Sequence, residues 1–353
     1  MTFDDVLIIK NGKNQRAVEN PDGKYPIYGS GGIMGYADDY ICEADTVIVG
    51  RKGSINNPIF VEEPFWNVDT AFGLVAKREV LLPRYLYYFC RNYDFERLNK
   101  AVTIPSLTKS DLLKIEITLP SLEIQEKIVN KLLKIEEVIQ ARQQQLQKLD
   151  VLVKARFVEL FGDPKYNKNN LVKIGEIGTL TSGGTPSRAK PEYFEGVIRW
   201  YSAGELNSLY LPDSVEHISQ TALKESSAKL FDKGTLMIGM YDTAAFKLGI
   251  LTEASSSNQA CANLNPQNDY NVVWLYYLFD IMKPIFLQER QGVRQKNLSL
   301  SKIREFEVPN APIELQNQFA AFVEQIDKSK VAVQKALDEA QLLFDSLMQK
   351  YFG

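Results

Sequence analysis

The residue types that most often carry catalytic chemistry are scarce and scattered in this chain. His217 is the single histidine, which excludes a cluster of imidazole ligands and leaves one candidate for an imidazole base. Cys42, Cys90 and Cys261 lie far apart, are odd in number and form no CxxC pair. This pattern indicates neither a disulfide framework nor a zinc site. We therefore expect no metal centre and expect His217 to be a surface or otherwise satisfied residue.

Two glycine-rich segments have the flexibility to approach a phosphate, namely residues 29–32 (GSGG) and 182–185 (SGGT). Neither matches the GxxxxGK[ST] of a P-loop or the GxGxxG of a dinucleotide site. No Ser/His/Asp arrangement, methyltransferase cofactor motif or nuclease carboxylate–lysine set stands out either. The sequence predicts a non-catalytic protein without a cofactor. An enzyme remains the alternative, with residues 182–187 (SGGTPS) and 290–297 (RQGVRQKN) around phosphates.

Length and composition indicate a globular protein of more than one domain. The chain has 353 residues, of which 45% are apolar and 24% charged. No apolar run is long enough to cross a bilayer, and the first residues do not have the pattern of a signal peptide. We therefore expect a cytoplasmic location.

The elements that must position any functional residue come in two copies. Residues 107–128 (LTKSDLLKIEITLPSLEIQEKI) match residues 298–319 (LSLSKIREFEVPNAPIELQNQF) at a constant offset of 191, without a gap. Upstream, at an offset of 189, residues 46–50 (TVIVG) match 235–239 (TLMIG), Ala71 matches Ala260, and residues 86–88 match 275–277. The chain is thus predicted to repeat one unit, a mixed domain followed by a long helix.

Both long helices carry apolar residues at alternating spacings of four and three, which is typical of a coiled-coil seam. Polar residues within the seam would penalise wrong registers. We favour packing of the two helices on each other, most simply antiparallel, over a homodimer. A helix over residues 122–160 would be about 58 Å long. The seam positions are Ile128, Leu132, Ile135, Ile139, Arg142, Leu146, Leu149, Val153, Arg156 and Leu160, and Phe319, Val323, Ile326, Lys330, Val333, Leu337, Ala340, Phe344, Leu347 and Tyr351.

The two domains that precede the helices are predicted to be α+β. Residues 46–54 and 234–240 have the pattern of short buried strands that run into glycine turns. Residues 83–100 and 271–290 have the pattern of amphipathic helices, whose many aromatic side chains we expect in the core. The expected boundaries are a first domain over 1–120, a first helix over 121–162, a second domain over 163–311 and a second helix over 312–353.

This layout resembles the specificity subunits of type I restriction-modification systems. The resemblance is carried by residues 171–194 (LVKIGEIGTLTSGGTPSRAKPEYF) with Ile198–Trp200, by 120–129 (PSLEIQEKIV) with its partner 311–320 (APIELQNQFA), and by 157–163 (FVELFGD). The most specific feature is P-x-x-E-x-Q at the start of a long helix, present twice. The first copy departs from the pattern, because its opening is shortened and lacks TPS and the insert that follows. We still expect the first domain to fold, with its target half read by different loops.

The resemblance implies a role in DNA recognition. Each domain would be a target-recognition domain for one half of a split, asymmetric DNA site, and the antiparallel helices, in a pseudo-twofold repeat, would set the distance between the halves. Two modification subunits that bind S-adenosylmethionine would methylate adenines, and motor/nuclease restriction subunits would cleave unmodified DNA. The chain itself would be non-catalytic. A scaffold whose helices only dock other proteins is the alternative.

On this view, the candidate readers are basic and polar side chains on glycine-bearing loops. Arginine suits guanine and amides suit adenine, whereas lysine and serine more often hold phosphates. The net charge is −3 and no region is a basic block, so either the Lys and Arg side chains gather on one face or a partner supplies much of the attraction for DNA. The candidates are Arg51, Lys52, Ser54, Asn56 and Asn57; Thr185, Arg188, Lys190, Arg199 and Tyr201; Tyr241 and Lys247; and Arg294, Gln295, Lys296 and Asn297.

Overall fold

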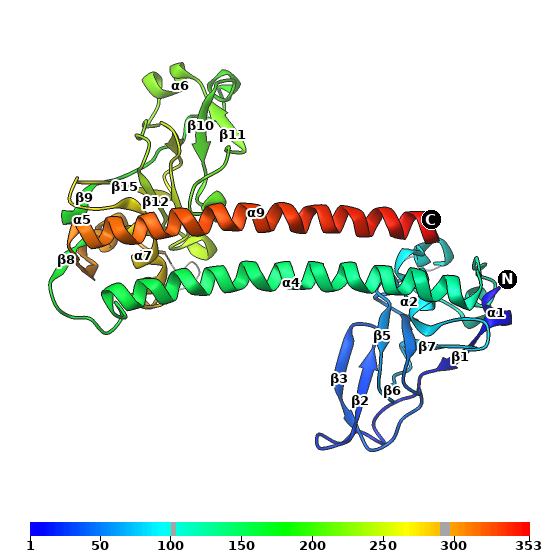
Figure 1. Cartoon of the computed structure of the whole chain (residues 1–353). Helices are drawn as coiled ribbons and strands as arrows, with labels where there is room; N and C mark the ends of the chain where they lie inside the picture. Colours follow the sequence, from blue (N-terminus) through cyan, green and yellow to red (C-terminus); the bar gives the residue numbers. More distant parts are fainter. Residues whose placement is uncertain (100–103, 290–296) are drawn as a thin grey trace. The chain divides into compact units, whose positions relative to one another are not determined.

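The computed structural model describes residues 1–99, 104–289 and 297–353 (Figure 1). The chain divides into two compact units: unit 1 comprises Met1–Gln144 and Val333–Gly353, and unit 2 comprises Gln145–Ala332. Two long helices, α4 (Leu122–Phe161) and α9 (Ile313–Phe352), each contribute one part to each unit.

Unit 1 is built on an antiparallel sheet with the strand order β1-β7-β4-β5. Every residue of β4 is buried, and helix α2 packs against β4, β5 and β7. A smaller sheet has the order β3-β2-β6, in which β2 and β6 run parallel. The elements are α1 (Phe3–Val6), β1 (Leu7–Asn11), β2 (Tyr25–Gly29), β3 (Gly32–Ala37), β4 (Thr46–Gly50), β5 (Ile59–Val61), β6 (Trp66–Asn67), β7 (Ala71–Ala76), α2 (Pro83–Asn92), η1 (Phe95–Leu98) and α3 (Lys109–Leu112).

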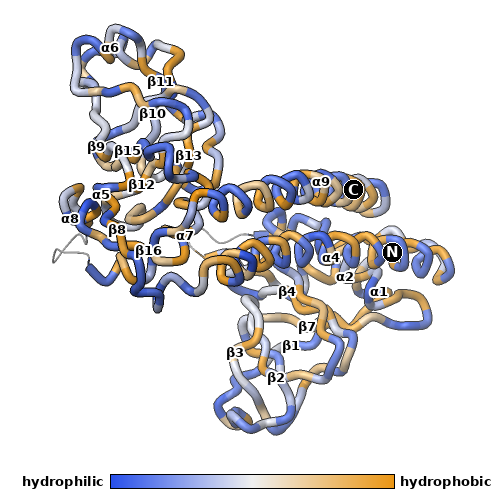
Figure 2. The backbone as a smooth tube through the Cα atoms, turned by 60° about the vertical axis from the view of Figure 1, so that its left-hand side comes forward, coloured by the Kyte–Doolittle hydropathy of each residue, from blue (hydrophilic) through white to orange (hydrophobic). Residues whose placement is uncertain are grey.

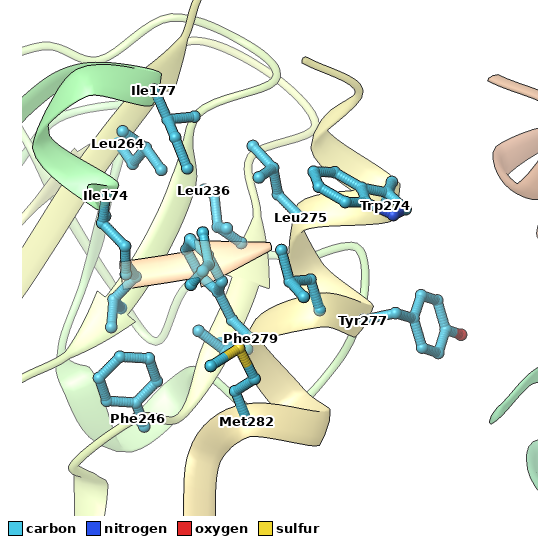
Figure 3. Packing of buried hydrophobic residues seen from close by; sticks show 14 of the residues in the cluster. Ile174, Ile177, Leu236, Phe246, Leu264, Trp274, Leu275, Tyr277, Phe279 and Met282 are labelled. Atoms are coloured by element: carbon cyan, nitrogen blue, oxygen red, sulfur yellow. The ribbon is translucent and has the colours of Figure 1, made fainter. Parts of the chain in front are cut away.

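Unit 2 has the corresponding sheet in the order β13-β12-β15-β9, and a smaller sheet in the order β11-β10-β14. Figure 3 shows Ile174 of α5, Leu236 of β12 and Phe279 of α7 within one apolar cluster. The elements are β8 (Leu171–Lys173), α5 (Ile174–Ile177), β9 (Gly178–Ser182), η2 (Pro191–Phe194), β10 (Ile198–Tyr201), η3 (Ala203–Glu205), β11 (Glu216–Ile218), α6 (Gln220–Glu225), β12 (Leu236–Gly239), η4 (Asp242–Ala244), β13 (Leu248–Ile250), β14 (Ser256–Ser257), β15 (Cys261–Pro266), α7 (Val272–Phe286), η5 (Leu287–Glu289), α8 (Leu300–Glu305) and β16 (Glu307–Pro309).

The repeat predicted from the sequence is confirmed in the fold, with one change of register. The strand orders of the two units correspond, and the parallel pair of the smaller sheet recurs as β2 with β6 and β10 with β14. Ala71 pairs with Gly50, whereas Cys261 pairs with Gly239. Cys261, and not Ala260 as the sequence predicted, is therefore the counterpart of Ala71. A one-residue difference between the copies in this region explains the error.

The shortened first copy still forms both sheets. It lacks the long insert of the second copy, but β2 and β3 are joined by a tight hairpin turn at residues 30–31. In unit 2 the corresponding strands, β10 and β11, are joined by residues 202–215, which include η3. The extra residues of the second copy therefore lengthen the β10–β11 connection and the β11–β12 connection, which contains α6, and they do not create the sheet.

The heptad seams of α4 and α9 are confirmed, because each predicted seam residue is buried or half-buried. In unit 1, Ile128 and Ile139 in the first half of α4 share a core with Phe344 near the end of α9. In unit 2, Phe157 near the end of α4 lies 5.3 Å, between ring centroids, from Phe319 near the start of α9. Early residues of one helix thus meet late residues of the other, so the pairing is antiparallel. Figure 2 shows apolar and polar residues alternating along both helices.

The polar seam residue Lys330 is satisfied within unit 2. Its ammonium lies 2.6 Å from Asp150 Oδ1 on α4 and 3.8 Å from Asp327 Oδ1 on its own helix. Burial raises the pKa of Asp327, although the charge of Lys330 opposes that rise. The pair with Asp150 favours one register of the two helices, because a shift along the seam would separate Lys330 from Asp150.

The aromatic helices are shorter than the sequence predicted. α2 ends at Asn92 because Tyr93 adopts an extended backbone, and the short 3₁₀ turn η1 follows. α7 ends at Phe286, two residues after Pro284. The expectation that their aromatic side chains belong to the core is confirmed: Tyr85, Tyr88, Trp274, Tyr277 and Phe279 are buried.

The glutamine of the first P-x-x-E-x-Q motif is fully buried and joins the long helix to its domain. Gln125 Oε1 accepts a hydrogen bond from the Leu82 N–H at 2.9 Å. Its Nε2 donates to the carbonyls of Val80 and Pro120, each at 2.9 Å. Leu82 is the N-cap of α2, so one side chain ties the start of α2 to the start of α4.

Gln316 repeats this arrangement in unit 2. Its Oε1 accepts from the N–H of Asn271, the N-cap of α7, at 2.8 Å. Its Nε2 donates to the carbonyls of Ala311 at 2.7 Å and Asp269 at 3.4 Å. The motif is therefore a structural joint between helix and domain in both copies.

We predict that Gln316→Ala lowers the free energy of unfolding by about 1–3 kcal/mol, because it leaves the half-buried Asn271 N–H and Ala311 carbonyl without this hydrogen-bond partner. Urea unfolding of the whole chain measures this change. The control is Gln318→Ala, an exposed glutamine two residues further along α9. Equal midpoints for the two variants would contradict the structural role of Gln316.

Candidate nucleic-acid interface

The predicted turns after the two central strands are confirmed. β4 ends at Gly50 and β12 ends at Gly239. A Cβ on Gly50 would lie 2.3 Å from the Ser54 carbonyl oxygen, and one on Gly239 would lie 2.0 Å from that of Ala244. Only glycine fits at either strand end, because the following loop folds back onto the backbone.

A second segment lies beside each of these loops. In unit 1, the Leu107 N–H donates to the Arg51 carbonyl at 2.9 Å, and Lys52 forms a β-bridge with Ser106. In unit 2, the Leu298 N–H donates to the Met240 carbonyl at 2.8 Å. We define tip 1 as residues 51–57 with 104–106, and tip 2 as residues 240–247 with 297–299.

Ser106 is a candidate that sequence reasoning missed. The offset of 191 carries Asn297 onto Ser106, so the repeat contained the signal that would have found it. Ser106 is half-buried, and its backbone N–H donates to Asn99 Oδ1 at 3.1 Å. The neighbouring Ile104 is 59% exposed, so tip 1 presents apolar as well as polar groups.

The five candidates of tip 1 differ in their availability. Arg51, Lys52, Ser54 and Asn57 are exposed. The Arg51 guanidinium lies 5.9 Å from the centroid of the Phe72 ring, and its Nη1 donates to the Asp69 carbonyl at 3.5 Å. These weak contacts orient the side chain without neutralising its charge.

Asn56 of tip 1 is already engaged. Its Nδ2 donates to Asp94 Oδ1 at 3.0 Å, and its Oδ1 accepts from the Phe95 N–H at 2.7 Å. Both ends of the amide therefore hold the start of η1 in place. A base contact through Asn56 would have to break one of these bonds.

Tip 2 brings together candidates from distant parts of the sequence. Tyr241 is 40% exposed and lines a cavity of about 230 Å³ together with Asn297 and Lys302. Lys247 is half-buried, and its Nζ donates to the Gly204 carbonyl at 3.3 Å. Arg294, Gln295 and Lys296 lie outside the described residues.

The basic candidates around the smaller sheet of unit 2 are paired with carboxylates. Arg188 forms an ion pair with Glu216, and its hydrogen bonds hold the pKa of that carboxyl below the usual value. Lys190 lies 3.3 Å from Glu225, whose pKa is likewise lowered, first by the Tyr193 hydroxyl and then by Lys190.

Arg199 and Thr185 are engaged as well. The Arg199 Nε lies 2.9 Å from Asp213 Oδ1 and 3.1 Å from Glu253 Oε1, and its side chain is 22% exposed. The Thr185 hydroxyl donates to the side chain of Gln259. Together with Arg188 and Lys190, these side chains stabilise the local fold in the DNA-free state.

Tyr201 is corrected from a surface reader to a core residue. It is 1% exposed and packs with Leu206, Leu211 and Met237. Its hydroxyl donates to the Pro212 carbonyl at 2.6 Å, and burial raises its pKa. Tyr201 lies on the face of β10 opposite Trp200, and it is buried because Leu206, Leu211 and Met237 cover that face.

The histidine has a hydrogen-bond partner, and the cysteines are buried. His217 Nε2 lies 3.0 Å from Asp213 Oδ1, which confirms a satisfied residue. The cysteines are buried, and burial raises the pKa of Cys42 to about 11 and that of Cys261 to about 12, which keeps these thiols protonated and unreactive. Within the described ranges, no group of three or more metal-ligating side chains occurs, and no helix is long and apolar enough to span a membrane.

Comparisons with known proteins match both copies of the repeat. The family model described as "Type I restriction modification DNA specificity domain" matches residues 1–150 and 166–340. The specificity subunit of the type I restriction enzyme MjaIX from Methanocaldococcus jannaschii is 29% identical over 163 residues, which are 44% of this chain and 37% of that protein. The EcoR124I/EcoR124II specificity subunit from Escherichia coli is 24% identical over 163 residues, 44% of this chain and 40% of that protein. The match thus spans well under half of either relative.

The fold is also that of chains in solved structures of type I restriction-modification systems. The S subunit of a type I restriction-modification system from M. genitalium superimposes with a TM-score of 0.65 at 19% identity, covering 100% of this chain and 95% of that one. A chain from a structure of type I restriction-modification complex assembly gives a TM-score of 0.63 at 17% identity, covering 100% and 96%. Since the family model covers most of the sequence, this chain belongs to the type I restriction-modification DNA specificity domain family.

Proposed function

We propose that this chain is the non-catalytic specificity subunit of a type I restriction-modification complex and that it selects the DNA sequence on which the complex acts. The observation that carries the proposal is the match of the family model to both copies of the repeat. Two domains built on one plan, each ending in an exposed strand-end loop, suit a target with two halves.

We propose that the globular domains and the long helices have different roles. Residues 1–120 and 163–311 are the target-recognition domains, and residues 121–162 and 312–353 are the spacer helices. A helix of the length of α4, 40 residues, extends about 60 Å, whereas one turn of DNA is about 34 Å. The two halves of the DNA target differ in sequence, because tip 1 and tip 2 present different side chains.

Within tip 1, the proposed chemistry follows from side-chain type. The exposed guanidinium of Arg51 suits the two acceptors of guanine, and the amide of Asn57 suits adenine. Lys52 and Ser54 suit phosphate contacts. In unit 2, Tyr241 and Asn297 are the described candidates, and Arg294, Gln295 and Lys296 stay predictions.

The basic side chains of the smaller sheet have a different proposed role. Arg188, Lys190 and Arg199 each lose a carboxylate partner if they turn toward DNA, so exchange of partners offsets much of the gain from a phosphate contact. We propose that they, with Thr185, hold the recognition domain in shape. Lys247 and Asn56, which also have partners, belong to the same class.

The charge of the chain supports the proposal that its DNA binding depends on partner subunits. The net charge of −3 and the carboxylate-paired cations of unit 2 leave little surplus positive charge for the DNA backbone. We propose that two S-adenosylmethionine-binding modification subunits supply it, that restriction subunits join them, and that the complex acts on double-stranded DNA in the cytoplasm.

The first experiment compares binding with and without partners. We expect the complex of this chain with two modification subunits to retain its target duplex tightly at physiological salt, and the isolated chain to bind weakly and without selectivity. The same modification subunits without this chain are the control, measured by retention of target against scrambled duplex. Tight, selective binding by the isolated chain contradicts the dependence on partners, and loss of selectivity in the full complex contradicts the function.

The second experiment tests tip 1. Arg51→Ala should weaken binding of the complex to its target by about 1–3 kcal/mol and relax the preference at one base pair, because a bidentate contact is lost. Arg78→Ala is the matched control, since Arg78 follows β7 at the opposite end of the same sheet and pairs with Asp45 at 2.9 Å. Unchanged affinity in Arg51→Ala removes this residue from the proposed interface.

A further inference from the structure

Phe246 combines full burial with a backbone conformation that aromatic residues rarely adopt. Its φ is +52°, in the left-handed region, and it is 0% exposed. The ring centroid lies 4.6 Å from that of Phe286 and 6.0 Å from that of Phe306. Figure 3 shows Phe246 among the residues of this cluster. Packing of the ring must therefore outweigh the strain of the backbone.

The loop that contains Phe246 is closed at its base. The Phe246 N–H donates to the Gly239 carbonyl at 2.8 Å, and the Gly239 N–H donates to the Lys247 carbonyl at 2.8 Å. Within the loop, the Ala244 N–H donates to the Tyr241 carbonyl at 3.0 Å. The exposed Tyr241 thus lies on a loop whose two ends are both bonded to the end of β12.

Unit 1 makes the equivalent turn differently. There the left-handed position is taken by Gly53, with φ +81°, and the loop is anchored by Ile55, which is 1% exposed. A glycine makes such a turn without strain. In unit 2 a single residue, Phe246, combines the left-handed backbone with the buried anchor that Gly53 and Ile55 provide separately in unit 1.

We propose that Phe246 is a positioning residue for sequence recognition: it holds the 240–247 loop preformed, so that Tyr241 contacts one base pair of the half-site read by unit 2. This inference rests on the proposed function and deepens it. A preformed loop avoids the entropy of ordering upon binding. Tyrosine offers a large, rigid surface with one polar atom, which can contact a base edge at low entropic expense.

The test uses the full chain in complex with its modification subunits and the target duplex. Each base pair of both half-sites is substituted in turn, and the affinity ratio of target to substituted duplex is measured. Tyr241→Ala should reduce this ratio about tenfold at one position of the half-site read by unit 2 and leave the other half-site unchanged. No change at any position, or equal change in both half-sites, overturns the inference.

The role of Phe246 is separated from simple stability by a matched pair of variants. Phe246→Leu and Phe279→Leu both remove a ring from one cluster, in which the two centroids lie 6.4 Å apart, but only Phe246 belongs to the loop. Phe246→Leu should reduce the ratio at the position that Tyr241→Ala affects, whereas Phe279→Leu should not. If Phe246→Leu and Phe279→Leu give the same affinity ratio of target to substituted duplex at that position, the positioning role of Phe246 is overturned.

Hydrogen exchange of the unaltered complex gives a second test, which holds even if Phe246→Leu does not fold. The amides of Ala244 and Phe246 should be protected without DNA and gain little protection when the target binds. Free exchange without DNA, followed by protection on binding, overturns the preformed loop. A complex without any sequence selectivity refutes the proposed function, whereas a selective complex that is insensitive to Tyr241→Ala and Phe246→Leu refutes this inference alone.

Discussion

Each globular unit completes its core with a helix end that belongs to the other copy of the repeat. In unit 1, Phe344 near the end of α9 is buried beside α2 and α4, and the ring centroid of Phe352 lies 5.0 Å from that of Tyr85. In unit 2, Phe157 of α4 packs against Phe319. Truncation of a buried aromatic residue of this kind costs about 3–5 kcal/mol. Neither copy can therefore fold with a full core unless α4 and α9 pair.

Because the helix ends are exchanged, the residues that hold the fold together are different residues from those that can vary between the two units. The seam residues and the buried glutamines Gln125 and Gln316 set the helix pairing and its attachment to the domains. The tips lie beyond the strand ends at Gly50 and Gly239, where they contribute little to the seam. Side chains at the tips can differ between the units without loss of the shared framework, which is the property that an asymmetric recognition site needs.

Local and periodic features of the sequence predicted most of the framework. The seam positions, the buried strands β4 and β12 and the aromatic cores followed from spacing and from the offsets of 191 and 189. Features that depend on contacts between residues far apart in the sequence were not predicted. The pairing of Arg188 with Glu216 joins two segments of unlike sequence, and the burial of Tyr201 depends on its packing against Leu206, Leu211 and Met237. The left-handed backbone of Phe246 has no local signal, because a bulky residue is not expected there.

The bipartite reading of DNA is tested most directly by the positions of modified adenines in DNA that the reconstituted complex has methylated. Sequencing that distinguishes methylated adenine should reveal two unlike specific segments separated by a spacer of fixed length and variable sequence. Each segment should depend on one unit only, so that substitutions in tip 1 and in tip 2 alter different segments. One continuous motif, two identical halves or modification without regard to sequence would contradict the division of the target between two recognition domains.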